Sequence, residues 1–176
     1  RAATSLESSY VRSVEFADPM GQTVAALDRV DIALERSQFA IATVWSNRVA
    51  PLIEQIDDPV LRARFGLHQA RLLAIARQPK PARLSLERAK TALKNDAQVW
   101  LKALVRAAEA EVLASEGQPQ ASLQAMREAA QLYTESERLT VVGIVAAQGD
   151  LYRLNERELR EKQMQQDSRL RDAQLD

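Results

Sequence analysis

The side chains best suited to catalysis are few in this sequence, and their spacing does not assemble a reaction centre. His68 is the only histidine and cysteine is absent, which excludes paired imidazoles, thiolate nucleophiles and sulfur-bound zinc. Asp28, Asp31 and Glu35 recur at helical spacing, but no Glu-x-x-His pattern accompanies them, so we interpret them as a solvated face. Neither GxGxxG nor GxxxxGK[ST] occurs. We therefore expect no catalytic residue, no metal site and no cofactor.

Charge is balanced over the whole chain but not along it. There are 24 basic and 24 acidic side chains, and the net charge is zero. Residues 1–58 hold five basic and nine acidic side chains, residues 59–94 nine and one, and residues 95–176 ten and fourteen. A basic block therefore lies between two acidic blocks. Two interpretations stay open: adjacent parts of the fold pair through complementary charge, or the basic block docks an anionic partner.

The basic block does not have the pattern of a nucleic-acid surface. Its cations include Lys80, Arg83, Arg88 and Lys90. At about 100° per residue these four spread around a helix instead of sharing one face, and no aromatic side chains interleave to stack on bases. We therefore expect no nucleic-acid partner. His68 lies in the same block and is predicted to be half-exposed, with positive neighbours that disfavour its protonation.

The elements that carry these residues are predicted to be helices. Five glycines and six prolines are too few for a many-stranded fold. Apolar spacing predicts helices at 22–35, 38–56, 60–77, 80–94, 97–116 and 119–134, and Pro51 should kink the second of these or end it early. A leading helix and loop occupy 1–21, a capping helix 135–154 and an exposed connector helix 155–176. No apolar run approaches the roughly 20 residues of a membrane span, so no membrane insertion is expected.

The six central helices form three pairs that recur every forty residues. A shift of forty superimposes Gln38 on Gln78 and Gln118, and Pro79 on Pro119. Small and large side chains also recur at matching places in the second and third pairs. They are Ala70, Leu73, Ala82, Leu86 and Ala89 in one pair, and Ala110, Leu113, Ser122, Met126 and Ala129 in the other. Small side chains there let the helices approach closely, and such pairs are stable only when they stack.

The third pair, from Ala110 through Gly117-Gln118-Pro119 to Ala129, resembles a tetratricopeptide repeat. The forty-residue period departs from the family's usual period of about thirty-four, and the large residue that the family favours early in the first helix is absent. The resemblance implies an all-α fold of tandem antiparallel helix-hairpin repeats, a tetratricopeptide-like solenoid, with a long C-terminal helix. It also implies a concave face, formed by the first helix of each pair, that holds a peptide or protein partner.

Carried over by position, that face contains eight candidate partner-binding residues. They are Asp31, Arg64, Leu67, Arg71, Ala74, Leu104, Ala107 and Glu111. Arg64 and Arg71 lie at its centre and could hold a carboxylate of the partner, because the guanidinium fork binds carboxylates through two hydrogen bonds. The alternative is that the same two arginines bridge to Asp31 and Glu111 on the neighbouring pairs.

The end of the chain carries a second functional hypothesis. A coiled-coil seam can be drawn through Tyr152, Leu159, Leu170 and Ala173, although polar residues occupy its other core places, and it could form a homodimer. Residues 160–176 resemble the linker before a diguanylate cyclase or histidine kinase domain, and the chain reads as part of such a longer protein. We therefore expect a non-catalytic regulatory or sensory protein-interaction module of a bacterial signalling protein that relays through its C-terminal helix. The alternative is a free-standing adaptor or chaperone. The cytoplasm is the expected compartment, and the periplasm is also compatible with a lack of cysteine.

Overall fold

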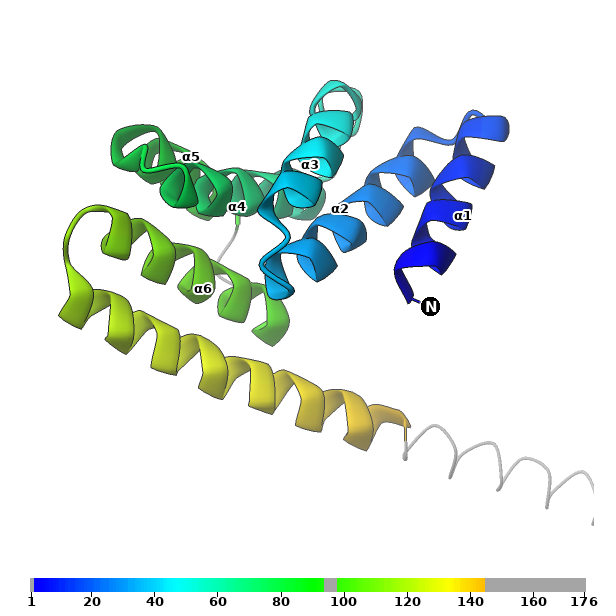
Figure 1. The fold of residues 1–176 in the computed structure, drawn as a ribbon. Coiled ribbons are helices and arrows are strands. Elements are labelled where there is room, and N and C mark those ends of the chain that lie inside the picture. Colours follow the sequence, from blue (N-terminus) through cyan, green and yellow to red (C-terminus); the bar gives the residue numbers. More distant parts are fainter. Residues whose placement is uncertain (1, 94–97, 145–176) are drawn as a thin grey trace, which may run out of the picture. The chain divides into compact units, whose positions relative to one another are not determined.

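The computed structural model describes residues 2–93 and 98–144, and the part of the chain it describes contains helices and no strands. The helices are α1 (Ala2–Glu15), α2 (Pro19–Glu35), α3 (Phe39–Ile53), α4 (Pro59–Ile75), α5 (Pro79–Ala92) and α6 (Val99–Ser115), followed by a helix over residues 119–144 (Figure 1). The chain divides into two compact units, Arg1–Tyr133 and Thr134–Asp176. The predicted all-α class is confirmed.

Helices after α1 begin at a constant interval of twenty residues. Their first residues are at positions 19, 39, 59, 79, 99 and 119. Proline occupies the first position of α2, α4 and α5, where its missing N–H leaves no backbone donor unsatisfied. The carboxylate of Asp18 accepts a hydrogen bond from the Gly21 N–H at 3.0 Å, and that of Asp58 accepts from Val60 and Leu61 at 2.8 and 2.9 Å. These caps and prolines fix where the helices begin.

The turn after α2, α4 and α6 has the same hydrogen bonding each time. A backbone N–H beyond the helix donates to the carbonyl five residues earlier, which is the bond of a Schellman motif. These bonds join Gln38 to Ala33, Gln78 to Leu73 and Gln118 to Leu113 at 2.8, 2.9 and 2.9 Å. The residue before each donor is left-handed; these residues are Ser37, Arg77 and Gly117, with φ of 55°, 59° and 77°. The same backbone turn therefore recurs every forty residues with three different side chains.

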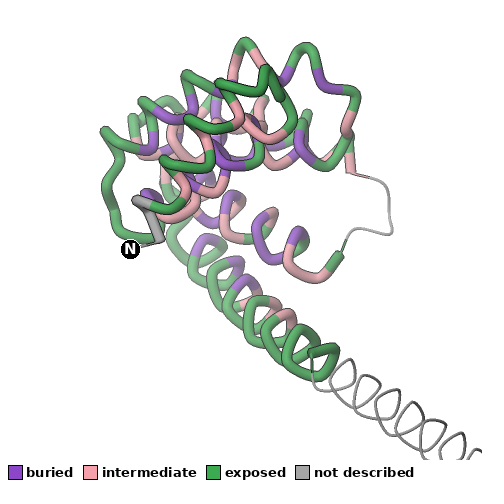
Figure 2. The backbone as a smooth tube through the Cα atoms, turned by 90° about the vertical axis from the view of Figure 1, so that its right-hand side faces the viewer, coloured by how far each residue is buried: buried purple, intermediate pink, exposed green. Residues whose placement is uncertain are grey.

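The core consists largely of small side chains on facing helices. Ala70, Ala82 and Ala110 have no exposed surface and Ser122 is 8% exposed, so the residues predicted to bury small side chains do so. A side chain added at Gly66 in α4 would place its Cβ 3.0 Å from the Cβ of Ala89 in α5. Figure 2 shows the buried residues gathered on the facing sides of the helices. Close approach of neighbouring helices is what the alanine-rich sequence provides.

The boundaries of α4, α5 and α6 lie within two residues of the predicted ones, while one boundary each of α2 and α3 differs by three. α2 begins at Pro19 rather than at residue 22, because Asp18 and Pro19 form a helix start rather than part of the preceding loop. α3 contains Pro51 and ends at Ile53, three residues before the predicted end at 56. The expectation that this proline ends the helix early is confirmed, since proline lacks the N–H that continues the helical hydrogen bonding.

The last described helix runs through the boundary predicted at residues 134 and 135. Within residues 135–144 of the predicted capping helix (135–154), the large apolar side chains are exposed; they are Leu139, Val141, Val142 and Ile144. The rest of that segment, and the whole predicted connector 155–176, lie outside the described residues. No helix in the described part of the chain is both long enough and apolar enough to cross a membrane.

Candidate partner-binding groove

The first helices of the three pairs, α2, α4 and α6, carry all eight candidate partner-binding residues, and α4 packs against both of the others. Leu67 has no exposed surface, while Ala74 and Leu104 are 4% exposed and Ala107 is half-buried. Leu67 is therefore a core residue with no surface to offer a partner, because it lies in a hydrophobic cluster formed by α4, α5 and α6. The four charged candidates join these helices to one another.

Arg64 on α4 is held by two carboxylates of α2. Its Nη2 donates to Asp28 Oδ1 at 2.6 Å and its Nε donates to Asp31 Oδ2 at 3.1 Å. Only 13% of the Arg64 side chain is exposed. The prediction that Asp28 and Asp31 belong to a solvated face was wrong, because the helix they belong to packs its charged side against α4.

His68 belongs to the same cluster. Its Nε2 lies 2.6 Å from Asp31 Oδ1, and its side chain has no exposed surface, so the expectation of a half-exposed histidine was wrong. Nδ1 of His68 is buried and has no hydrogen-bond partner within the described part of the chain. Sequence neighbours suggested a basic environment, but the nearest charged group is a carboxylate from the preceding helix pair.

The pKa of Asp31 reflects this enclosure. Burial alone would raise it, since a desolvated carboxylate favours its neutral form. The adjacent His68 and the Arg64 guanidinium more than offset burial, and together they lower the pKa of Asp31 from 3.8 to about 2. Asp31 is therefore ionised at neutral pH and binds both partners as a carboxylate.

Arg71 makes the equivalent connection from α4 to α6. Its Nε and Nη2 donate to Glu111 Oε1 at 3.1 and 2.8 Å, and 14% of its side chain is exposed. Although burial acts against the charged form of Arg71, its hydrogen bonds to Glu111 raise the pKa of the guanidinium. Both central arginines thus bridge to the neighbouring pairs, as the alternative interpretation of the sequence held.

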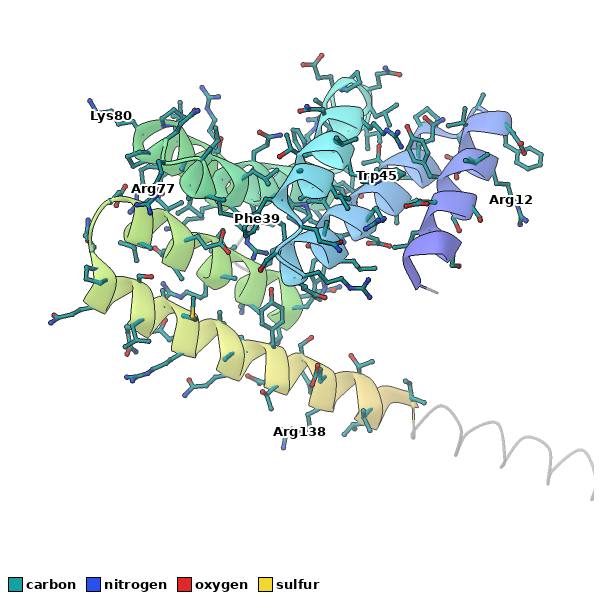
Figure 3. All side chains as sticks on the ribbon, viewed as in Figure 1. Arg12, Phe39, Trp45, Arg77, Lys80 and Arg138 are labelled. Carbon is teal, nitrogen blue, oxygen red and sulfur yellow. The ribbon has the colours of Figure 1, made fainter. Side chains whose placement is uncertain are left out.

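Further pairs extend the pattern across the basic block. Arg83 donates to both carboxylate oxygens of Glu116 at 2.9 and 2.5 Å, and Lys90 Nζ lies 3.5 Å from Glu109 Oε1. Lys80 extends from the start of α5 away from the helices (Figure 3). Five cations of the basic block therefore pair with acidic residues outside it, as the interpretation of complementary charge predicts; they are Arg62, Arg64, Arg71, Arg83 and Lys90.

A cavity of about 340 Å³ opens beside this cluster. It is lined by Asp31, Glu35, Arg64, Trp100, Leu104 and Tyr133, and we call it the Trp100 groove. A second cavity of about 340 Å³ is bordered by α4 and α6. It is lined by Ala74, Ile75, Arg77, Glu111, Ala114 and Ser115. Five of the eight candidates, all except Leu67, Arg71 and Ala107, therefore border one of the two cavities.

The sequence interpretation missed three residues of the Trp100 groove: Glu35, Trp100 and Tyr133. Trp100 precedes Leu104 by four residues and so lies on the same face of α6, which was a usable signal. Tyr133, on the helix after α6, is 41% exposed. Its place in the groove depends on how that helix returns along α6, and residue spacing within one helix gives no signal for that.

The charged groups beside the groove are hydrogen-bonded to one another. Among the described residues, no group of three potential ligands from histidine, aspartate and glutamate could hold a metal ion. The cluster consists of carboxylates already engaged by cations, which suits neither a general base nor a nucleophile. No protein-family model, no curated protein and no solved structure matches the chain.

Asp31→Asn should remove a pH-dependent part of the stability. Because the folded-state pKa of about 2 lies below the ordinary 3.8, the carboxylate stabilises the fold above pH 4, and this contribution is lost as pH falls toward 2. The pKa difference corresponds to about 2 kcal/mol at neutral pH. Urea denaturation of both proteins should show a stability gap of at least that size near pH 7, shrinking by roughly half near pH 3.

Asp57→Asn is the matched control. Asp57 is fully exposed and lies 3.5 Å from Arg62, so its removal should leave stability unchanged across the same pH range. Equal pH profiles for the wild-type chain and Asp31→Asn would contradict the proposed role of the buried carboxylate.

Proposed function

We propose that the chain is a non-catalytic protein-interaction module whose Trp100 groove receives a segment of a protein or peptide partner. The observation that carries this proposal is the groove itself, in which a half-buried tryptophan and an exposed tyrosine border a cavity between helices. Aromatic side chains at a concave surface supply apolar contact area together with a polar edge, and they are enriched where proteins bind partners.

The proposed architecture is a tetratricopeptide-like stack of three helix pairs. Its support is the turn that recurs with the same hydrogen bonds after α2, α4 and α6, and the burial of Ala70, Ala82, Ala110 and Ser122. In such a stack the first helices share one face, and the two cavities bordered by α4 and α6 lie where a bound segment would contact successive pairs.

Peptide selection tests the proposed binding function. We expect phage-displayed random peptides selected on the whole chain to shift NMR signals of the Trp100 groove. Tyr133→Ala should weaken their binding about tenfold, since truncating an aromatic anchor costs more than 1 kcal/mol. Leu84→Ala, on an exposed position of α5, is the control and should leave binding unchanged.

Two outcomes would overturn the binding proposal. Selected peptides whose signals map to α5 or α3 would place the interaction elsewhere. Equal loss of affinity in Tyr133→Ala and Leu84→Ala would show that the Trp100 groove has no special part in binding.

We further propose that the module regulates a larger bacterial signalling protein and relays its state through the C-terminal helix. This part rests on the sequence of residues 155–176, which lie outside the described residues. Light scattering should report a dimer for the whole chain and a monomer for a chain ending at residue 154, because the seam would be the dimer contact. If both chains are monomers, the proposed relay through the C-terminal helix is contradicted.

A further inference from the structure

The Trp100 groove carries an excess of negative charge that the sequence did not suggest. Its one guanidinium, Arg64, is engaged by Asp28 and Asp31, and Glu35 adds a third carboxylate at the lining. The charged residues that line the groove are therefore two carboxylates, Asp31 and Glu35, and one guanidinium. The arginine expected to receive an acidic guest is therefore already satisfied, and the groove repels a further carboxylate.

Glu35 is the carboxylate that remains available to a guest. It is exposed, and within the described part of the chain it forms no ion pair. It is the last residue of α2, so the negative end of the helix dipole adds to the negative potential around its carboxylate. A positive group entering the groove would meet Glu35 at the mouth and the Asp31 carboxylate deeper inside.

The aromatic lining favours the same kind of guest. Trp100 and Tyr133 border the groove from α6 and from the helix that follows it, and the faces of both rings attract cations. Burial raises the pKa of the Tyr133 hydroxyl, Arg71 acts to lower it, and the carboxylates of Asp31 and Glu35 raise it further. The carboxylates of α2 therefore act on the aromatic side of the cavity together with the opposing charge of Arg71.

The size of the groove limits the guest. A volume of about 340 Å³ is at the lower end of ligand sites, which span roughly 300–1,000 Å³. Leu104 adds apolar lining for a methylene stem. One long, positively charged side chain with its neighbouring backbone matches this combination of apolar lining, aromatic rings and carboxylates.

We propose that the Trp100 groove binds a lysine or arginine side chain of a basic peptide segment in the partner. The proposal rests on the proposed function and specifies the ligand of the same groove. It reverses the preference for a carboxylate that Arg64 and Arg71 suggested in the sequence, because both arginines are consumed by contacts between the helices.

Four host peptides of glycine and serine, differing only in a central arginine, lysine, citrulline or glutamate, test this preference. The chain has two tryptophans, so NMR shows two indole N–H signals, with Trp100 reporting on the groove and Trp45 on the distant contact of α3 with α1. The arginine and lysine peptides should shift the Trp100 signal saturably and leave Trp45 unchanged. Citrulline, which keeps the shape of arginine without its charge, should bind at least several-fold more weakly.

A pair of matched variants separates a specific contact from general attraction. Glu35→Gln should weaken the arginine peptide about threefold, the effect of losing one exposed charge partner. Glu54→Gln removes the same charge from an exposed position after α3, outside the groove, and should leave affinity unchanged. Equal weakening by both variants would overturn the proposal, because it would show only long-range attraction.

The remaining outcomes distinguish this proposal from the function on which it rests. A Trp100 signal that responds to the glutamate or citrulline peptide as strongly as to arginine overturns the cation preference and leaves peptide binding in place. If none of the four peptides shifts the Trp100 signal, the cation preference is overturned as well. The selection of random peptides then decides separately whether the groove binds peptides at all.

Discussion

Charged contacts join the first helices of the three helix pairs, α2, α4 and α6. Positions 31, 71 and 111 are equivalent under the forty-residue shift, and they hold an aspartate, an arginine and a glutamate. Arg71 is bonded to Glu111 on α6, while Asp31 is bonded to Arg64 and His68 on α4. Burying such charges costs desolvation energy, so their main contribution is to specificity rather than to net stability. The charge at position 71 is opposite to the charges at positions 31 and 111, which are both negative. An arrangement that placed the first pair beside the third would therefore bring two negative charges together.

This use of arginine determines which charged groups the Trp100 groove presents. Small side chains bring the helices close, and this close packing buries the guanidinium groups of Arg64 and Arg71. Arg64 binds carboxylates of the preceding pair, and Arg71 binds one of the following pair. The Trp100 groove presents the exposed carboxylate of Glu35, the half-buried Trp100 and the exposed Tyr133. The proposed preference for a positively charged partner thus follows from packing between the pairs.

The sequence predicted the parts of this structure that have a local cause. Prolines and capping residues indicated the helix starts, and the small residues at matching places predicted the buried positions Ala70, Ala82 and Ala110. It failed where the cause lies in another helix. The full burial of His68 and the recruitment of Tyr133 to the groove both depend on how helices return against one another. The spacing of residues along one helix carries no information about that geometry.

A double-mutant cycle on Arg71 and Glu111 measures the central contact most directly. The free energy of unfolding is determined for Arg71→Met, for Glu111→Gln and for the double variant, with the wild-type chain as reference. Direct bonding between the side chains predicts a coupling energy of about 1–3 kcal/mol, with the double variant losing less than the two single losses combined. Losses that add to within about 0.3 kcal/mol would contradict the account, because they would mean that α4 and α6 associate without this pair.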